Sequence, residues 1–185
     1  RYITSVPELS PDGLGLEFHF TPTETGLSND ARYITVAPGS KHFTKMWCAG
    51  RYAELCRLIL ASGITPVLVG GTDDAAVCAE IEQRCPGVKN LSGRNDTVLI
   101  GSVMRQSLAS VCNDSGLMHL SCAVGVPVLV FFGSTVKEFG FFPYKNKSVV
   151  MENTTLTCRP CSHIGKNTCP KGHFLCMASL QPGEP

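Results

Sequence analysis

Short apolar runs alternate with amphipathic stretches along the middle of this chain. The runs cover residues 33–37 (YITVA), 65–69 (TPVLV), 88–91, 110–112 and 127–132 (PVLVFF). Continuous apolar and β-branched runs of this length predict strands that are buried on both faces. Helices are predicted between them, near residues 49–62, 73–84, 97–108 and 113–124. This alternation predicts an α/β fold over residues 32–150: a Rossmann-like parallel sheet with helices on both faces.

The two ends of the chain lack this pattern. Residues 1–31 are rich in Pro, Gly, Thr and Ser, and they predict irregular chain with a short extended piece at residues 16–20. Residues 151–185 form a Cys-rich tail, which we expect to pack on the α/β domain.

Three polar loops follow strands of the predicted sheet. Right-handed crossovers place every strand-to-helix loop of a parallel sheet at one edge. Ligands of open α/β sheets bind at that edge. The loops are rich in Gly, Ser, Asp and Lys and cover residues 37–45, 70–74 and 113–116. We therefore expect them to line a common site.

The first loop, APGSKHFTK, has the chemistry of an anion cradle. It offers backbone N–H groups near Ser40, the hydroxyls of Ser40 and Thr44, and the ammonium of Lys45. The loop is not a P-loop, because GxxxxGK[ST] is absent, and it lacks the dinucleotide-binding fingerprint. A solvated turn with lysines at the surface is the alternative interpretation.

The segment NDSGLMHL (113–120) is a more specific indication of a phosphate site. Asp114 or Ser115 is expected to cap the next helix, which leaves the N–H groups of the first turn free for a phosphate. Ser115 and His119 are four residues apart and share one helix face, so His119 can donate to a phosphate oxygen. The alternative is that Asp114 only caps the helix and that His119 only packs under a neighbouring loop.

The segment GGTDD (70–74) is weaker evidence for a ligand site than the other two loops. Its two glycines allow a flat ligand, such as a base or a ribose, to approach the backbone closely. Asp73 or Asp74 can accept hydrogen bonds from ribose hydroxyls. An acidic residue at a helix start is more often only a cap, so this loop decides nothing by itself.

Composition narrows the classes of function. The chain has 16 Lys and Arg against 15 Asp and Glu, a formal net charge of +1, which excludes a dedicated nucleic-acid binder. No run reaches the roughly 18 apolar residues of a membrane span, and the start has no signal-peptide pattern. Six of the ten cysteines lie in apolar segments as small core residues, which favours a reducing, cytoplasmic setting.

The other four cysteines lie in the tail. They are Cys158, Cys161, Cys169 and Cys176, with two histidines between them. Zinc tetrahedra use such ligands, but the second pair lacks C-x2-C spacing. A structural metal, a disulfide and packed thiols all stay open.

Several of these segments, taken in order, resemble one known family. They are APGS…K-x-W (37–47), the strand–GG–helix unit (65–84), LSGR (91–94), NDSGLMH (113–119), G-x-P-V-L-x-x-F-G (125–133) and the final C-x2-C…C-P-x-G-H-x-x-C-M. The family is that of the ADP-heptose:lipopolysaccharide heptosyltransferases, the ninth glycosyltransferase family, of GT-B architecture. The resemblance covers about residues 33–180. Cys48 departs from it, because the family usually has Pro after the Trp of its lysine motif.

The resemblance implies a two-domain enzyme that transfers heptose from ADP-heptose to the lipopolysaccharide inner core, with inversion and without a metal or other cofactor. This chain is similar to the carboxy-terminal, donor-binding half, so residues 1–31 are expected to be a connector from an amino-terminal domain. That domain would bind the acceptor, a lipid A–linked oligosaccharide at the inner membrane, and supply the general base. We therefore expect the chain alone to be inactive, and the enzyme to be cytoplasmic or peripheral at the inner membrane.

The same resemblance implies roles for individual residues. Ser40 and Lys45 would contact the diphosphate, and Lys45 would be the catalytic group that stabilises the leaving group. Ser115 and Gly116 would offer backbone N–H groups to it, with His119 nearby. A cation and oriented N–H groups stabilise the charge that develops on a departing nucleoside diphosphate.

Two acidic positions would contact the sugars. By the resemblance, Asp114 would accept hydrogen bonds from the hydroxyls of the transferred sugar, and Asp73 or Asp74 would approach the ribose. No metal ligand is implied.

Two other functions stay open. Another GT-B nucleotide-sugar enzyme, such as a sugar-nucleotide epimerase, would use similar loops but prefer UDP or GDP. A non-catalytic binding module with a zinc-ordered Cys tail belongs to a different class, and metal analysis would distinguish it.

Overall fold

The computed structural model describes residues 13–28 and 30–183. Its centre is a six-stranded sheet with the order β3-β2-β1-β4-β5-β6, in which all five pairings are parallel. The strands are β1 (Tyr33–Ala37), β2 (Thr65–Leu68), β3 (Lys89–Asn90), β4 (Ser110–Asn113), β5 (Val128–Phe132) and β6 (Ser148–Glu152). The chain starts the sheet in the middle and adds strands to either side, which is the order of doubly wound folds.

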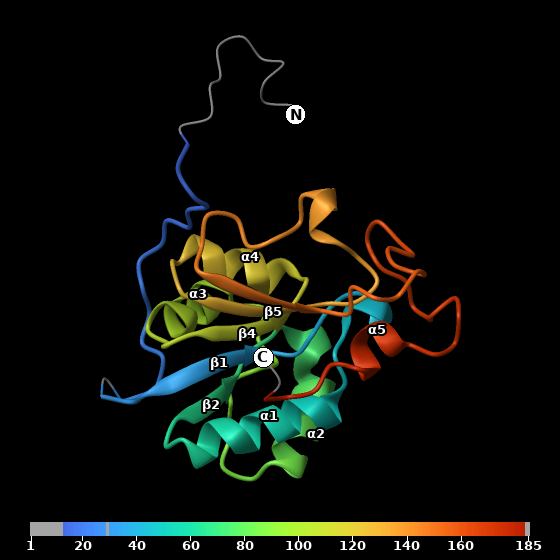
Figure 1. Cartoon of the computed structure of the whole chain (residues 1–185). Coiled ribbons are helices and arrows are strands. Elements are labelled where there is room, and N and C mark those ends of the chain that lie inside the picture. The colour runs from blue at the N-terminus through green and yellow to red at the C-terminus, as the bar shows by residue number, and fades with distance from the viewer. Residues whose placement is uncertain (1–12, 29, 184–185) are drawn as a thin grey trace.

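Helices cover both faces of this sheet, α3 and α4 on one side and α1 and α2 on the other (Figure 1). They are α1 (Ala49–Ala61), α2 (Ala75–Arg84), α3 (Thr97–Arg105), α4 (Gly116–Ala123) and α5 (Leu175–Ala178), with 3-10 turns η2 (Phe43–Lys45), η3 (Thr72–Asp74) and η4 (Lys137–Phe139). The two faces bury separate apolar clusters, as expected for a sheet covered on both sides. The predicted α/β class is confirmed.

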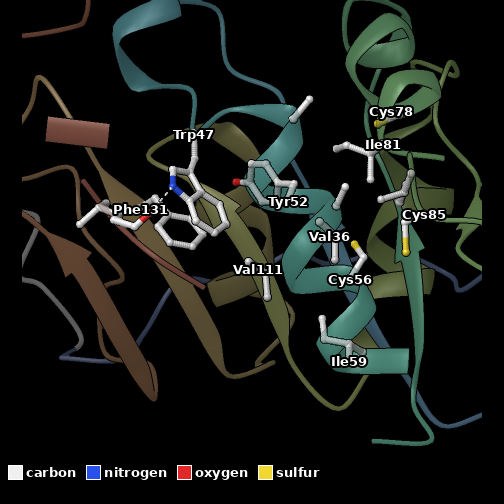
Figure 2. Packing of buried hydrophobic residues seen from close by; sticks show 14 of the residues in the cluster. Val36, Trp47, Tyr52, Cys56, Ile59, Cys78, Ile81, Cys85, Val111 and Phe131 are labelled. Atoms are coloured by element: carbon white, nitrogen blue, oxygen red, sulfur yellow. Dashed lines mark hydrogen bonds between the residues drawn. The ribbon is translucent and has the colours of Figure 1, made fainter. Parts of the chain in front are cut away.

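An aromatic group anchors the tail to the face that carries α1. The rings of Trp47 and Phe131 stack with their centroids 4.0 Å apart, and Tyr52 meets Trp47 edge-on (Figure 2). The indole N–H of Trp47 donates to the carbonyl of Leu180 at 3.3 Å. The tail thus packs on the core, because its aliphatic residues complete this cluster.

Strand β6 was not predicted, and it changes the boundary drawn between residues 150 and 151. That boundary falls inside β6, which pairs in parallel with β5 from Ser148 to Glu152. β6 lies at the edge of the sheet, and its Val149 is exposed. Ser148 and Val149 are exposed, whereas Val150 and Met151 are half-buried against the two core clusters, so β6 lacks the long buried apolar run by which the other strands were found.

The segment predicted to be extended, residues 16–20, joins no strand ladder. This segment is irregular, and it is held by two side chains instead of a strand ladder. The rings of Phe18 and Phe20 lie 4.8 Å apart and pack over Gly101 of α3. Residues 1–12 of the predicted connector lie outside the described residues.

None of the helices in the described part of the chain combines the length and the apolar character needed to cross a membrane.

Candidate functional site: a two-part pocket at the carboxyl edge of the sheet

The three polar loops meet in one cavity of about 860 Å³. The loop after β1 supplies Ser40, the loop after β2 supplies Asp74, and the loop after β4 supplies Ser115 and Gly116. The full lining is Gly39, Ser40, Lys41, Met46, Gly71, Asp73, Asp74, Asn95, Thr97, Ser115, Gly116, Leu117 and Leu120. β1, β2 and β4 are neighbours in the sheet, so their exits converge at its carboxyl edge.

Asp74 ties the first two loops together. A Cβ at Gly39 would overlap the carboxylate of Asp74, and a Cβ at Gly70 would lie 2.6 Å from its Cβ. The N–H of Gly71 donates to Oδ2 of Asp74 at 3.0 Å. Burial raises the pKa of Asp74; the Gly71 N–H opposes this shift and the neighbouring Asp73 adds to it.

The amino end of α4 is open to the cavity. A Cβ at Gly116 would meet nothing within 4 Å, so a ligand can reach the first backbone N–H groups of the helix. The hydroxyl of Ser115 is buried and has no hydrogen-bond partner among the described residues. These donors, together with the helix dipole, suit an anionic group.

A smaller pocket of about 260 Å³ adjoins this one, and Ser115 and Gly116 line both. It is lined by Lys45, Asp114, Ser115, Gly116, His119, Phe141, His163 and Ile164. Nζ of Lys45 lies 2.9 Å from Oδ2 of Asp114, and their side chains are 14% and 3% exposed. The hydroxyl of Thr135 donates to the same Oδ2 at 2.6 Å. One carboxylate oxygen therefore fixes the position of the ammonium.

His119 lies in this smaller pocket, half-buried. Burial lowers its pKa; Asp114 opposes the shift, and the positive charge of Lys45 adds to it. The neutral imidazole is therefore favoured, with one ring N–H to donate into the pocket.

Asn113 links the loops that carry this site, although no role for it was predicted from the sequence. Its side chain is fully buried. Oδ1 accepts from the backbone N–H of Trp47 at 3.1 Å and from the Tyr52 hydroxyl at 2.9 Å. Nδ2 donates to the carbonyls of Pro38 at 2.7 Å and Gly39 at 3.3 Å. This amide holds the first loop and the start of α1 against the end of β4.

The predicted residues thus divide between the two parts of the site. Ser40 and Asp74 line the larger part, Lys45, Asp114 and His119 line the smaller, and Ser115 and Gly116 stand between them. The structure brings these positions together without testing their roles toward a ligand.

One local prediction, the cap of α4, is confirmed only in its position, and another is wrong. Ser115 is the N-cap residue of α4, but its side chain makes no capping hydrogen bond. Asp114 does not cap the helix either, because its carboxylate is held by Lys45 and Thr135. Thr44 was expected to offer its hydroxyl to an anion, but this hydroxyl is buried against Ser134 and the N–H of Lys166.

The cysteines are all free thiols in this structure. Among the described residues, no group of three or more His, Cys, Asp or Glu side chains is arranged to hold a metal ion. The predicted alternative of a zinc-ordered tail therefore gains no support from the fold.

Comparison with known sequences adds the decisive observation. The sequence model of glycosyltransferase family 9 (heptosyltransferase) matches residues 5–171. The chain belongs to glycosyltransferase family 9.

Curated relatives of this family 9 chain include two heptosyltransferases. It is 28% identical over 161 residues to lipooligosaccharide heptosyltransferase 2 of Campylobacter jejuni, covering 84% of this chain and 49% of the relative. It is 29% identical over 132 residues to lipopolysaccharide heptosyltransferase 2 of Escherichia coli, covering 66% and 37%. The chain therefore spans about half, or less, of the length of these relatives.

Solved structures agree with the family assignment. The E. coli ADP-heptose lipopolysaccharide heptosyltransferase II superposes with a TM-score of 0.63 at 26% identity, over 83% of this chain and 47% of that one. A family 9 glycosyltransferase from Veillonella parvula gives a TM-score of 0.72 at 23% identity, over 83% and 48%. The second likeness shows the shared fold.

Proposed function

We propose that this family 9 domain is the donor-binding half of a heptosyltransferase that transfers heptose from ADP-heptose to the lipopolysaccharide inner core. The observation that carries the proposal is the two-part pocket. It joins a cavity large enough for a nucleoside to an anion site made of the α4 N-terminus and Lys45. The names of the E. coli relatives supply the donor and the acceptor class.

The larger part of the pocket is assigned to the nucleoside. Asp74, with Asp73 beside it, is placed to accept from ribose hydroxyls, and Leu117 and Leu120 offer an apolar surface to a base. Ser40 and the open amino end of α4 lie on the way to the smaller part, where the diphosphate would reach Lys45.

In the proposed reaction, an acceptor hydroxyl attacks the anomeric carbon of the heptose from the side opposite to the diphosphate. The bond from that carbon to the diphosphate oxygen breaks, and ADP leaves with the bonding electrons. Lys45 has three N–H donors, of which Asp114 takes one, so the others can meet the charge that develops on the departing oxygen. Ser115 and the N–H of Gly116 add neutral donors.

The acceptor proton needs a base, and this proposal places it on the amino-terminal half implied by the family resemblance. Asp114 is a poor candidate, because Lys45 and Thr135 already occupy its Oδ2. The same half would hold the acceptor, a lipid A–linked oligosaccharide, on the cytoplasmic side of the inner membrane. The cations and dipoles of the pocket neutralise the diphosphate, so the proposed transfer needs neither a metal nor another cofactor.

Calorimetric titration of the purified 185-residue chain with ADP-heptose, ADP, UDP and GDP tests the donor assignment. We expect ADP and ADP-heptose to bind and the other two to bind more weakly. Lys45→Met should abolish most of the affinity, whereas Lys171→Met, at an exposed tail lysine, should not change it. A preference for UDP or GDP would favour another GT-B enzyme, and absence of binding by all four would reject the proposal.

A second measurement tests whether the base and the acceptor site lie outside this chain, as proposed. The chain alone should transfer no heptose to an acceptor, because the base and the acceptor site are proposed to lie outside it. Transfer by the isolated chain would contradict that placement. Stoichiometric zinc in the purified protein, lost with chelator together with thermal stability, would favour the binding-module alternative.

A further inference from the structure

We propose that Thr135 and Arg159 are positioning residues for the ammonium of Lys45, and that this is what the Cys-rich tail contributes to the site. The inference rests on the proposed function for the purpose of Lys45, but its geometry stands without any ligand. A continuous line of contacts runs from Arg159 through the exit loop of β5 to Thr135, then to Asp114 and Lys45.

The line ends at one oxygen atom. Oδ2 of Asp114 accepts from the Thr135 hydroxyl at 2.6 Å and pairs with Nζ of Lys45 at 2.9 Å. Asp114 and Thr135 are both about 2% exposed, so water does not compete for these contacts. The hydroxyl therefore sets which way the carboxylate faces, and the carboxylate sets where the ammonium lies.

Arg159 holds the loop that carries Thr135. Its guanidinium is 5% exposed and donates to the carbonyls of Gly133 and Thr135, the latter at 3.0 Å. It also donates to the carbonyls of Phe132 and Asn153. An ion pair with Glu152 at 2.9 Å balances its charge. A planar group with five donors in a fixed geometry can hold several carbonyls at set positions, whereas the three donors of a lysine rotate about one nitrogen.

A second part of the tail confines Lys45 from the other side. A Cβ at Gly165 would lie 2.9 Å from Cδ of Lys45. Gly165 is kept there because the neighbouring Lys166 makes two hydrogen bonds with Thr44. The backbone N–H of Lys166 donates to Oγ1 of Thr44, and its carbonyl accepts from the Thr44 N–H. The stem of Lys45 thus packs on the tail while its Nζ pairs with Asp114, which limits the directions open to Nζ.

The consequence for the chemistry is preorganisation. A free lysine side chain samples many rotamers, and ordering it at the moment of binding costs free energy. A lysine already held at the amino end of α4 stabilises a diphosphate without that cost. Thr135 and Arg159 touch no substrate in this scheme, so they act only through Lys45.

The experiment reads the environment of Lys45 directly in the full chain. Lysines are methylated with 13C-formaldehyde under reducing conditions, and the resonance of Lys45 is assigned with Lys45→Arg. We expect Lys45 to react more slowly than the exposed lysines, and to react faster in Thr135→Val and in Arg159→Lys. Thr135→Ser keeps the hydroxyl and should restore the slow rate. Thr155→Val is the matched control, because Thr155 is exposed and its hydroxyl donates to Oδ1 of Asn153 and not to Asp114.

ADP affinity and melting temperature are measured on the same variants. Loss of one hydrogen bond to the carboxylate should weaken ADP binding about tenfold, equal to about 1.4 kcal/mol, in Thr135→Val. Thr135→Ser and Thr155→Val should stay within about twofold of the parent chain. If Thr135→Val does not fold, the comparison of Arg159→Lys with Thr135→Ser carries the test.

The outcomes separate this inference from the proposed function. If Lys45 reacts at the parent rate in folded Thr135→Val and Arg159→Lys, the positioning role is wrong, whatever the affinity for ADP. If the chain binds no ADP but the reactivity of Lys45 changes as expected, the positioning role stands and the proposed donor is wrong. If reactivity rises while ADP affinity is unchanged, the part of the inference that links the tail to the ligand is overturned.

Discussion

The carboxylate of Asp74 fills the space in which a side chain at Gly39 would have to lie. The same carboxylate accepts from the N–H of Gly71, so the exits of β1 and β2 are fitted to each other through one half-buried acid. The contact explains why the first loop can approach the second so closely, and why a cavity exists between them and α4.

Gly39→Ala should therefore destabilise the fold. The added methyl group must displace the Asp74 carboxylate, and overpacking of this kind costs about 1–3 kcal/mol. Urea denaturation measures the loss. In a double-mutant cycle, Asp74→Ala should remove most of the penalty, and additive effects of the two changes would mean that the overlap is relieved elsewhere.

Gly116→Ala is expected to behave in the opposite way. Its methyl group meets nothing within 4 Å, so the free energy of unfolding should stay within about 0.5 kcal/mol of the parent value. The methyl group would instead stand in the open space at the amino end of α4, where the diphosphate is proposed to bind. ADP affinity should fall by calorimetry while the melting temperature holds. Unchanged affinity would remove α4 from the anion site.

Replacing Lys45 should have two separable effects. Lys45→Met leaves the buried Asp114 without its cation, and breaking a buried pair in this way costs about 3–5 kcal/mol. Adding Asp114→Asn removes the unpaired charge, so the double variant should recover most of that stability. ADP binding should remain lost in both variants, because the ammonium is absent from each. Recovery of binding in the double variant would show that Lys45 has only a structural role.

The stability of the fold should depend on pH through His119. Its pKa is lowered from the ordinary 6.5, chiefly by burial, so the folded state resists a proton that the unfolded state accepts. The contribution to stability is therefore lost as pH falls below about 6.5, until the lowered pKa of the folded state is reached. His119→Gln should have a flatter stability profile between about pH 7 and pH 5 in urea titrations. A profile equal to that of the parent chain would contradict this assignment.

Asn113→Leu should be among the most damaging single substitutions. It removes an amide that makes four hydrogen bonds at a fully buried position, leaving the Tyr52 hydroxyl and the Pro38 carbonyl without that partner. Unsatisfied buried groups cost about 1–3 kcal/mol each. Tyr52→Phe loses only one of these bonds and should cost about 1 kcal/mol, as measured by denaturation. Similar losses for the two variants would argue against a shared network.

Much of the sheet was predictable because its inner strands carry a simple signal. β1, β2, β4 and β5 are buried on both faces, so a run such as VLVFF marks a strand without ambiguity. β6 gives no such signal, because its apolar run, Val149 to Met151, is only three residues long and is flanked by polar residues. Local pattern does not encode the order of the strands either, since that order depends on packing between segments that are distant in the chain.

The candidate site was predictable to the level of its loops but not of its contacts. The polar residues at strand ends were found, since topology places them at one edge. The partners of Asp114 were not, because a local rule assigns an acid before a helix to capping. Here Asp114 pairs instead with Lys45, which lies 69 positions earlier in the chain. A buried carboxylate without a cation costs more free energy than an uncapped helix end. The role of Arg159 was not predicted either, because its partners are mostly backbone carbonyls, which every residue has.

The tail residues that support Lys45, Arg159 and Lys166, are made late in the synthesis of the chain. Arg159 and Lys166 leave the ribosome only after all six strands have been made, yet they hold Thr135 and Thr44, which lie beside Asp114 and Lys45. A nascent chain that ends at β6 has all the strands of the sheet, but Lys45, which we propose to contact the diphosphate, still lacks the contacts that the tail provides. The proposed donor site is therefore completed late in translation, after the strands that carry it have been made.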